Sequence, residues 1–187
     1  RVINRMMGNP AWFRQKVRPR IRPGERALEI GAGTGELALQ LTDWGVPTDG
    51  LDRVSRPEKW PASFEWHSED LRSFAHYSRY PVILGNLIFH HLNDGELSEL
   101  GDKLRSSARV IVACEPWRRP SSQVLLRIAG PIFGANQVTL HDGHVSIAGG
   151  FAGNELPDAL GLFEPEWNIE CTQNVLGAYH LIATRRE

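Results

Sequence analysis

Several features are scarce or missing in this sequence, and each absence excludes a class of protein. Only two cysteines occur among the 187 residues, Cys114 and Cys171. Two are too few for a disulfide-stabilised scaffold, and their spacing does not fit a metal site. The longest apolar run, from Tyr80 to Phe89, is too short to cross a bilayer, and the N-terminus lacks the pattern of a signal peptide. We therefore predict a soluble, cytoplasmic protein with reduced thiols and no metal ion.

An excess of charge of one sign is also missing. The 21 Lys and Arg residues nearly balance the 22 Asp and Glu residues, and the net charge is -1. The basic residues are nevertheless concentrated before Glu25, the first acidic residue, in a segment 1–24 that we expect to be helical. This segment is interpreted as a solvated helix face beside the domain. A patch for an acidic substrate, a membrane surface or nucleic acid is the alternative.

The length and the hydrophobic periodicity predict one domain that covers residues 1–187. Asn9 is expected to cap the N-terminal helix. Trp12, Phe13 and Val17 follow at helical spacing, which favours core packing over a substrate lid. Strands are expected at 27–30, 46–51, 64–67, 82–84, 108–114, 167–172 and 176–184, and helices within 2–17 and at 36–44, 71–77, 94–107, 121–129 and 154–160.

The pattern of residues 27–39 predicts a strand, a tight turn and a helix in direct succession. Glycines stand at 31, 33 and 35, and from Glu36 onward Leu and Ala recur at helical spacing. Glycine permits positive φ and lets a backbone approach a ligand closely, and the start of a helix offers free N–H groups. We therefore expect a nucleotide-like ligand at this turn.

The spacing of the glycines separates the types of nucleotide site. A dinucleotide fingerprint needs a third glycine where this chain has Glu36, whose carboxylate would face a pyrophosphate, and a P-loop needs Lys and Ser or Thr after Gly35. Glu29 and the three glycines instead form Glu-x-Gly-x-Gly-x-Gly. This pattern resembles motif I of the class I S-adenosylmethionine-dependent methyltransferases. Their ligand is a cationic amino acid joined to a nucleoside without phosphate, which suits an acidic neighbour.

The resemblance extends beyond motif I. Residues 80–92, an apolar strand followed by Gly85-Asn86 and later by His-His-Leu, are similar to the motif IV region of small-molecule methyltransferases. Residues 141–147 are similar to a segment of bacterial methyltransferases of natural-product pathways. The resemblance implies an α/β, Rossmann-like, doubly wound fold with a mostly parallel seven-stranded sheet, an antiparallel last strand and helices on both faces. It also implies S-adenosyl-L-methionine as cofactor and S-adenosyl-L-homocysteine as product.

Cofactor roles follow from the resemblance at successive strand ends. Glu29 and the glycine turn would hold the methionine part. Asp52 ends the second strand at about the interval where a doubly wound fold places an acid opposite a ribose. Asp70 and Leu71 match the pair that contacts adenine; Glu69 is the alternative acid, and Asp70 also suits a helix cap. The full set of cofactor-binding candidates is Glu29, Gly31, Ala32, Gly33, Gly35, Asp52, Arg53, Asp70, Leu71, Asn86 and Leu87.

Three histidines are candidate general bases, since an unperturbed imidazole pKa of about 6.5 suits proton removal from a phenol or hydroxyl. His90 and His91 are adjacent and would diverge by about 100° on a helix, so they do not easily face one ligand together. His141 lies in the segment 130–153, where we expect a substrate-side insertion. The alternative is a structural role. His90 and His91 would then cap and pack the short helix after the strand, and His141 would be a surface residue in a loop. Glu115, at a strand end, either faces the acceptor or pairs with Arg118 or Arg119.

These features together predict an enzyme, a class I methyltransferase that moves a methyl group to an O, N or C nucleophile of a small molecule, with a phenolic or natural-product-like acceptor favoured. A nucleic-acid partner is not expected, and the oligomeric state has no sequence signal. One alternative is a methyltransferase acting on RNA or protein through the basic N-terminal segment and Arg118 and Arg119. The other is a non-catalytic domain that binds the cofactor.

Overall fold

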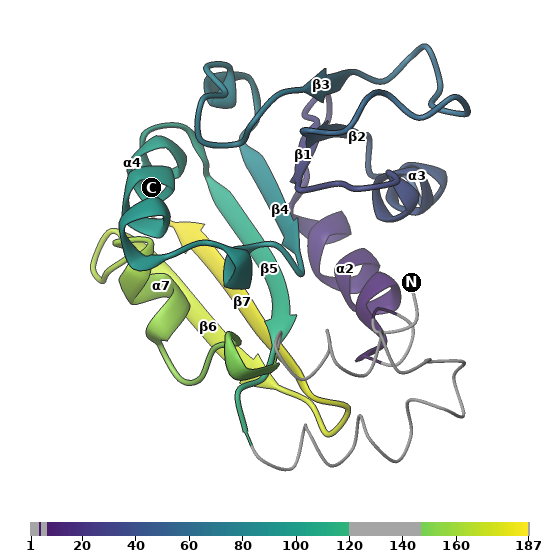
Figure 1. Cartoon of the computed structure of the whole chain (residues 1–187). Helices are drawn as coiled ribbons and strands as arrows, with labels where there is room; N and C mark the ends of the chain where they lie inside the picture. Colours follow the sequence, from purple (N-terminus) through teal and green to yellow (C-terminus); the bar gives the residue numbers. More distant parts are fainter. Residues whose placement is uncertain (1–3, 5–6, 120–146, 187) are drawn as a thin grey trace.

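The computed structural model describes residue 4, residues 7–119 and residues 147–186. Seven strands form one sheet in the order β3-β2-β1-β4-β5-β7-β6 (Figure 1). Parallel pairing joins β3 to β2, β2 to β1, β1 to β4 and β4 to β5, while β7 is antiparallel to both of its neighbours. The strands are β1 (Ala27–Ile30), β2 (Thr48–Asp52), β3 (Trp66–Ser68), β4 (Val82–Asn86), β5 (Val110–Pro116), β6 (Trp167–Gln173) and β7 (Ala178–Arg185). The predicted Rossmann-like, doubly wound α/β sheet is thereby confirmed.

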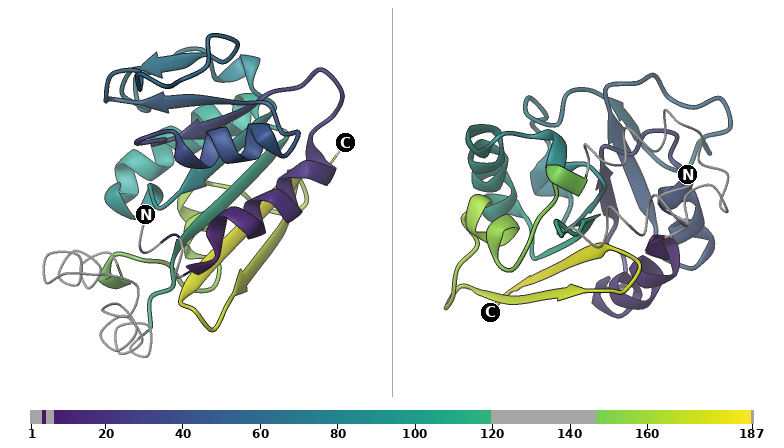
Figure 2. Two further views of the ribbon diagram at one scale, coloured as in Figure 1. Left: turned by 90° about the vertical axis from the view of Figure 1, so that its right-hand side faces the viewer. Right: turned by 60° about the horizontal axis from the view of Figure 1, so that its bottom comes forward.

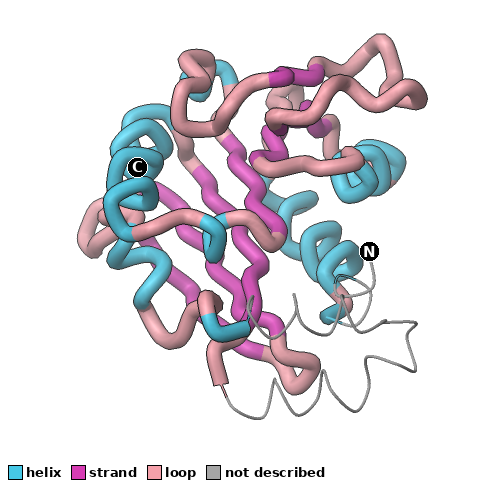
Figure 3. The backbone as a smooth tube through the Cα atoms, viewed as in Figure 1, coloured by secondary structure: helices cyan, strands magenta, loops and turns pink. Residues whose placement is uncertain are grey.

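Helices cover both faces of the sheet (Figure 3). Helices α2 (Asn9–Val17) and α3 (Glu36–Asp43) pack on one face, seen from the side in Figure 2, and α4 (Asp94–Ser107) and α7 (Glu155–Ala159) pack on the other. Side chains of β4 alternate between the two layers, because successive residues of a strand point to opposite faces. Val82 and Leu84 join the α2–α3 cluster, and Ile83 joins the α4–α7 cluster.

Most elements begin and end within two residues of the prediction. The second strand starts at Thr48 rather than at residue 46, because Pro47 has no N–H to donate to a ladder. Asn93 closes a capping box with Glu96 at the start of α4, as its sequence suggests. The stripe on α2 is core packing, as favoured, since Phe13 and Val17 are fully buried. Three short 3-10 helices complete the described part: η1 (Arg18–Arg20), η2 (Tyr77–Arg79) and η3 (Phe89–His91).

Two expectations about helices are wrong. Asn9 does not cap α2: Gly8, with φ 72°, precedes the helix, and no side chain caps it. The Asn9 side chain is turned into the core instead. The predicted helix 71–77 is a turn followed by η2; the N–H groups of Ser73 and Phe74 both bond to the carbonyl of Asp70 at 3.0 Å, which closes a single turn. The predicted helix 121–129 lies outside the described residues.

The carboxyl ends of the parallel strands meet at one edge of the sheet. Residues Ile30, Asp52 and Asn86 end β1, β2 and β4 there, and the turns that follow carry most of the candidate site residues. In open α/β sheets this is the edge at which ligands bind. The fold therefore positions the site before any side chain is considered.

Candidate functional site

The glycine turn after β1 has the backbone that its sequence predicts. Gly31, Gly33 and Gly35 adopt φ of 66°, 57° and 71°, in the left-handed region that favours glycine. A Cβ atom at Gly31 would lie 2.5 Å from the side chain of Ile88, and one at Gly35 would lie 2.4 Å from Trp60. The turn therefore requires glycine both for its conformation and for space.

Asp52 is held against this turn. Its Oδ2 accepts a hydrogen bond from the N–H of Gly33 at 2.7 Å, and its Oδ1 accepts one from the N–H of Val54 at 3.1 Å. The N–H of Ala32 also bonds to the adjacent strand, at the carbonyl of Leu51, 3.1 Å away. The carboxylate thus has a fixed position at the end of β2, beside the glycines.

A pocket of about 460 Å³ opens at this edge of the sheet, and we call it the strand-end pocket. Its volume falls within the range of small-molecule sites. It brings together predicted cofactor residues from three strand ends with one predicted base, His91. Its lining residues are Gly31, Leu51, Asp52, Arg53, Glu69, Asp70, Leu71, Arg72, Ile88, His91, Leu92 and Glu96. The candidates that do not line it are Glu29, Ala32, Gly33, Gly35, Asn86, Leu87 and His90.

An ion-pair network that the sequence did not indicate forms one wall of this pocket. Arg72 donates to both carboxylate oxygens of Asp70, at 2.9 and 2.7 Å, and to Glu96 at 2.5 Å. The hydrogen bonds from Arg72 lower the pKa of Asp70 to about 2. Asp70 is therefore ionised and already paired. Glu69, the alternative acid for adenine, is exposed and lines the same pocket.

Glu29 lies beneath the glycine turn rather than in the pocket. Its side chain is buried on the α3 side of β1, where Oε2 accepts a hydrogen bond from the N–H of Ala38 at 2.9 Å. Burial raises its pKa to about 8, against the opposing effect of that hydrogen bond. In this position Glu29 ties β1 to α3 and so supports the turn.

The end of β4 carries a strained residue. Leu87 has φ 59° and is the one non-glycine residue with positive φ among those described, while its N–H bonds to the carbonyl of Cys114 at 2.8 Å. Such conformations persist where the surrounding structure imposes them, often at binding sites. The preceding Asn86 accepts a hydrogen bond at Oδ1 from the Nδ2 of Asn9, 2.9 Å away.

Glu115 does not pair with Arg118 or Arg119, so that expectation is wrong. It does not line the strand-end pocket either, and a role toward the acceptor stays a prediction. It is fully buried on the α4 side, where Oε1 accepts hydrogen bonds from the N–H groups of Ile88 and Phe89, both at 2.9 Å. Its Oε2 lies 2.6 Å from the Nδ1 of His90. The acid is drawn inward because the turn after β4 has N–H groups without other partners; Arg118 pairs with Glu155 instead.

His90 and His91 have different surroundings. The His90 side chain is only 4% exposed, and its Nε2 has no hydrogen-bond partner among the described residues. The ring of His91 packs on it with a centroid distance of 4.0 Å and lines the strand-end pocket. Partial burial and the neighbouring His90 lower the pKa of His91. The third candidate base, His141, lies outside the described residues, as does most of the predicted insertion 130–153.

Comparison with solved structures places this arrangement among known folds. The plantazolicin methyltransferase BpumL in complex with SAH superposes over 100% of this chain and 85% of its own, with a TM-score of 0.75 and 13% identity. The chain has the Rossmann-like methyltransferase fold. A second structure comes from work on the conversion of a disulfide bond into a thioacetal group during echinomycin biosynthesis. It matches 94% of this chain and 82% of its own, with a TM-score of 0.65 and 20% identity.

Magnesium protoporphyrin IX methyltransferase (ChlM) from Synechocystis PCC 6803, with bound SAH, matches 98% of this chain and 83% of its own, with a TM-score of 0.60 and 16% identity. No protein-family model and no curated protein sequence matches the chain. The similarity is therefore one of backbone arrangement, and the roles of individual residues depend on the geometry described above.

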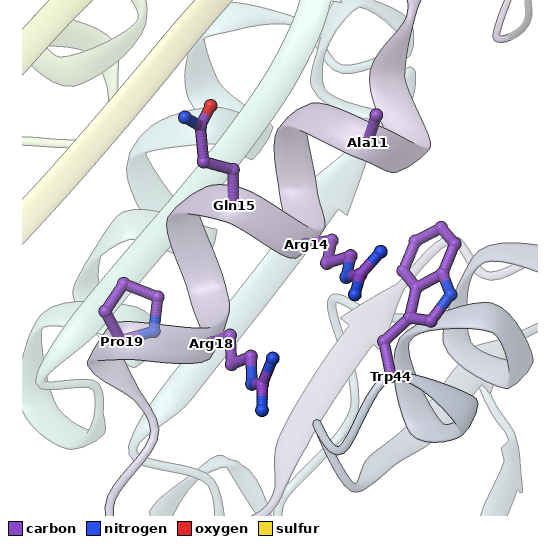
Figure 4. A pocket seen from close by; sticks show the side chains of 6 residues that line it. All are labelled: Ala11, Arg14, Gln15, Arg18, Pro19 and Trp44. Atoms are coloured by element: carbon purple, nitrogen blue, oxygen red, sulfur yellow. The ribbon is translucent and has the colours of Figure 1, made fainter.

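A second, larger hollow in this methyltransferase fold lies between α2 and α3, and we call it the helix groove. It measures about 690 Å³ and is lined by Ala11, Arg14, Gln15, Arg18, Pro19 and Trp44. Arg14 extends from α2 toward Trp44, and Arg18 follows at the start of η1 (Figure 4). The Arg14 guanidinium lies 5.1 Å from the Trp44 ring centroid. Trp44 follows α3 and precedes β2, so the helix groove lies away from the carboxyl ends of the strands.

No cluster of three or more His, Cys, Asp or Glu side chains is arranged to hold a metal ion among residues 4, 7–119 and 147–186. In the same ranges no helix is both long and apolar enough for a membrane span.

Proposed function

We propose that this protein is an S-adenosyl-L-methionine-dependent methyltransferase that methylates a small-molecule acceptor. One observation carries the proposal: the strand-end pocket joins the glycine turn, the fixed carboxylate of Asp52 and the pair Asp70 and Leu71 in one continuous site. These are the three features that the resemblance assigns to the methionine, ribose and adenine parts of the cofactor. The similarity of the whole backbone to methyltransferases crystallised with SAH supports it.

The residues present fit this cofactor. Asp52 offers carboxylate oxygens for the two ribose hydroxyls, and at Gly33 no atom lies within 4 Å of the place that a Cβ would take. Leu71 offers an apolar surface for the adenine ring, with Glu69 or Asp70 as acceptor for its amino group. Arg53, Ala32, Gly33, Gly35, Asn86 and Leu87 complete the proposed cofactor site, with Glu29 acting from beneath the turn. When bound, the cofactor supplies a methyl group on a sulfonium.

The chain's own residues then align the acceptor, exclude water and remove a proton where the acceptor carries one. We assign the proton transfer to His91, because its ring lines the strand-end pocket and a base must come within hydrogen-bond reach of the proton that it removes. The buried His90 ring packs on His91, and Glu115 holds the Nδ1 of His90. His90, which does not line the pocket, is the second candidate base.

The predicted insertion 130–153, with His141, is proposed to bind the acceptor. The region between β5 and α7 has two described ends, and these ends lie next to each other, which supports the proposal. The N–H of Phe151 bonds to the carbonyl of Pro116 at 3.0 Å, and Trp117 pairs with Phe151. The connection therefore leaves and re-enters at the carboxyl edge, beside the proposed site.

A small-molecule acceptor fits better than RNA or protein. The neighbouring structures include a plantazolicin methyltransferase and a magnesium protoporphyrin IX methyltransferase. Arg14 and Arg18 of the basic segment lie at the helix groove, away from the strand-end pocket. Both cysteines are free thiols, in keeping with a cytoplasmic location.

A thermal-shift experiment with S-adenosylhomocysteine, S-adenosylmethionine and NAD tests the proposal. Ligands that bind only the folded state raise its melting temperature, so the first two should stabilise the wild type and NAD should not. Asp52→Ala should remove the shift. An absence of any shift with the wild type, or an equal shift with NAD, would contradict the cofactor assignment. Acceptor screening would begin with phenols and other small natural products.

A further inference from the structure

One face of α2 lines the helix groove. Ala11, Arg14, Gln15 and Arg18 recur at helical spacing, which places them on the same side of the helix. All four residues are exposed. The face that packs on the sheet is a different one and carries Phe13, which is fully buried. The helix groove is therefore lined by an outward-facing surface of α2.

Two cations of this surface have no acidic partner. In the part of the chain that the structure describes, neither Arg14 nor Arg18 forms an ion pair. The next arginine is already used, because Arg20 lies 3.6 Å from Glu170. Arg20 also donates to the carbonyl of Lys16 at 2.9 Å, so it satisfies a carbonyl at the end of α2. Arg14 and Arg18 thus keep charged donors available for a ligand.

Trp44 holds Arg14 in a geometry that suits a carboxylate. The guanidinium lies 5.1 Å from the ring centroid of Trp44, in a cation–π contact (Figure 4). The N–H groups of a guanidinium form a planar fork that matches the two oxygens of a carboxylate. Arg18 follows one helical turn later, at the spacing where two side chains of a helix are neighbours.

The helix groove suits a short acidic peptide better than a nucleic acid or a membrane. Nucleic-acid binding depends on a broad field of cations, whereas two arginines line the groove and the net charge of the chain is -1. A helix that lies in a membrane surface inserts an apolar face, whereas this face of α2 carries arginine and glutamine. A hollow of about 690 Å³ between two helices has room for several side chains, and Arg and Trp are common anchors of protein interfaces.

We propose that the helix groove is the docking site for an acidic segment of a partner protein, an inference that goes beyond the proposed function. Carboxylates of that segment pair with Arg14 and Arg18, and a neighbouring apolar side chain packs on Ala11 and Trp44. The partner is not the methyl acceptor, because the groove lies away from the carboxyl ends of the strands. The basic N-terminal segment thereby gains a specific role in place of a solvated helix face.

Fluorescence anisotropy of the full chain with a labelled peptide of alternating glutamate and leucine tests this inference. The titration is run at about 0.15 M salt, where charges more than about 8 Å apart are screened. The wild type should bind the peptide with a dissociation constant of about 1 mM or below. Glutamine in place of glutamate in the peptide should weaken binding about tenfold, since two exposed ion pairs are lost. The double variant Arg14→Gln and Arg18→Gln should show the same loss.

Lys16→Gln is the matched control, because Lys16 lies on the same helix but does not line the groove. It should leave peptide binding unchanged, whereas Arg14→Gln alone and Arg18→Gln alone should each weaken it about threefold. An equal loss in the Lys16 variant would mean that net charge alone attracts the peptide, and it would overturn the inference. Equal binding of the glutamine peptide, or no binding by the wild type, would overturn it as well.

Two further probes separate the kinds of partner. Oligothymidylate and phosphatidylglycerol vesicles should bind the wild type more weakly than the acidic peptide. Tighter binding of either probe that is lost in the double arginine variant would identify a nucleic acid or a membrane as the partner and would overturn the choice of a peptide. S-Adenosylhomocysteine binding by the wild type is measured in parallel, and its absence would contradict the proposed function alone.

Discussion

The strand-end pocket and the helix groove differ in a way that their sizes do not predict. The helix groove, at about 690 Å³, is larger than the strand-end pocket, at about 460 Å³. Its walls are exposed helix side chains such as Arg14 and Arg18, whose positions depend on flexible stems (Figure 4). The strand-end pocket is built on the ends of buried parallel strands, with the Asp52 carboxylate held by two N–H groups. Fixed polar groups on a rigid sheet, rather than volume, distinguish the proposed functional site.

The largest expected effect concerns His91, in the lining of the strand-end pocket. With an acceptor that must lose a proton, His91→Gln should lower turnover about 10²- to 10⁴-fold, because a positioned base contributes that much. Initial rates over a pH series measure this, and the deficit should shrink above the pKa of the acceptor. Gln15→Ala in the helix groove is the control and should retain full turnover; full turnover in the His91 variant would contradict the assignment.

A somewhat smaller effect is expected for Asp52. Asp52→Ala should weaken S-adenosylhomocysteine binding about 100-fold, since two hydrogen bonds to a charged group contribute about 1.5–3 kcal/mol each and a factor of ten corresponds to about 1.4 kcal/mol. The N–H of Gly33 also loses its acceptor. Calorimetry measures the affinity. A comparable loss of S-adenosylhomocysteine affinity in Arg18→Ala would contradict the conclusion that the strand-end pocket, and not the helix groove, binds the ligand.

Glu29 gives a pH-dependent prediction. Burial raises its pKa from 4.5 to about 8, so folding favours the protonated acid. Its contribution to stability is complete below pH 4.5 and is lost as the pH rises to about 8. Glu29→Gln keeps an oxygen for the Ala38 N–H but does not ionise. The free energy of unfolding of the variant, relative to that of the wild type, should rise by a few kcal/mol between pH 5 and pH 9, at about 1.4 kcal/mol per pKa unit. Urea unfolding at several pH values measures this; parallel curves would refute it.

The smallest effect belongs to the helix groove. Arg14→Ala removes a cation–π contact with Trp44, which contributes about 0.5–1 kcal/mol at an exposed site. Arg18→Ala should change stability even less. Neither should alter S-adenosylhomocysteine affinity by more than twofold. Denaturant unfolding and calorimetry test both statements, and a strong loss of ligand binding in either variant would mean that the groove communicates with the site.

The sequence predicted those parts of the fold that depend on neighbours in the chain. The glycine turn was predictable because positive φ is a property of single residues. Helix α4 was predictable because its capping box and apolar face repeat at fixed spacing. Six of the predicted residues line the strand-end pocket: Gly31, Asp52, Arg53, Asp70, Leu71 and His91. The roles of all the candidates at the site stay predictions until they are tested by substitution.

The interpretation of single polar residues was less secure, and the errors have one cause. Asn9 has the sequence context of a helix cap, and Glu115 is followed a few positions later by Arg118 and Arg119. Each side chain instead turns into the core, where unpaired groups need partners more than they do at the surface. Glu29 also lies under α3 rather than in the pocket, and its cofactor role stays a prediction. Local sequence lists the possible partners of a polar side chain but does not rank them by burial.

The sequence by itself thus determined the order of elements, the glycine turn and the edge of the sheet at which the site lies. Only the tertiary structure decided which distant side chains meet there. Glu115 contacts His90 across 25 residues, Arg72 contacts Glu96 across 24, and Asn9 contacts Asn86 across 77. Each of these contacts depends on strand order, register and helix docking. Those are set by burial of the whole core, which no short stretch of sequence encodes.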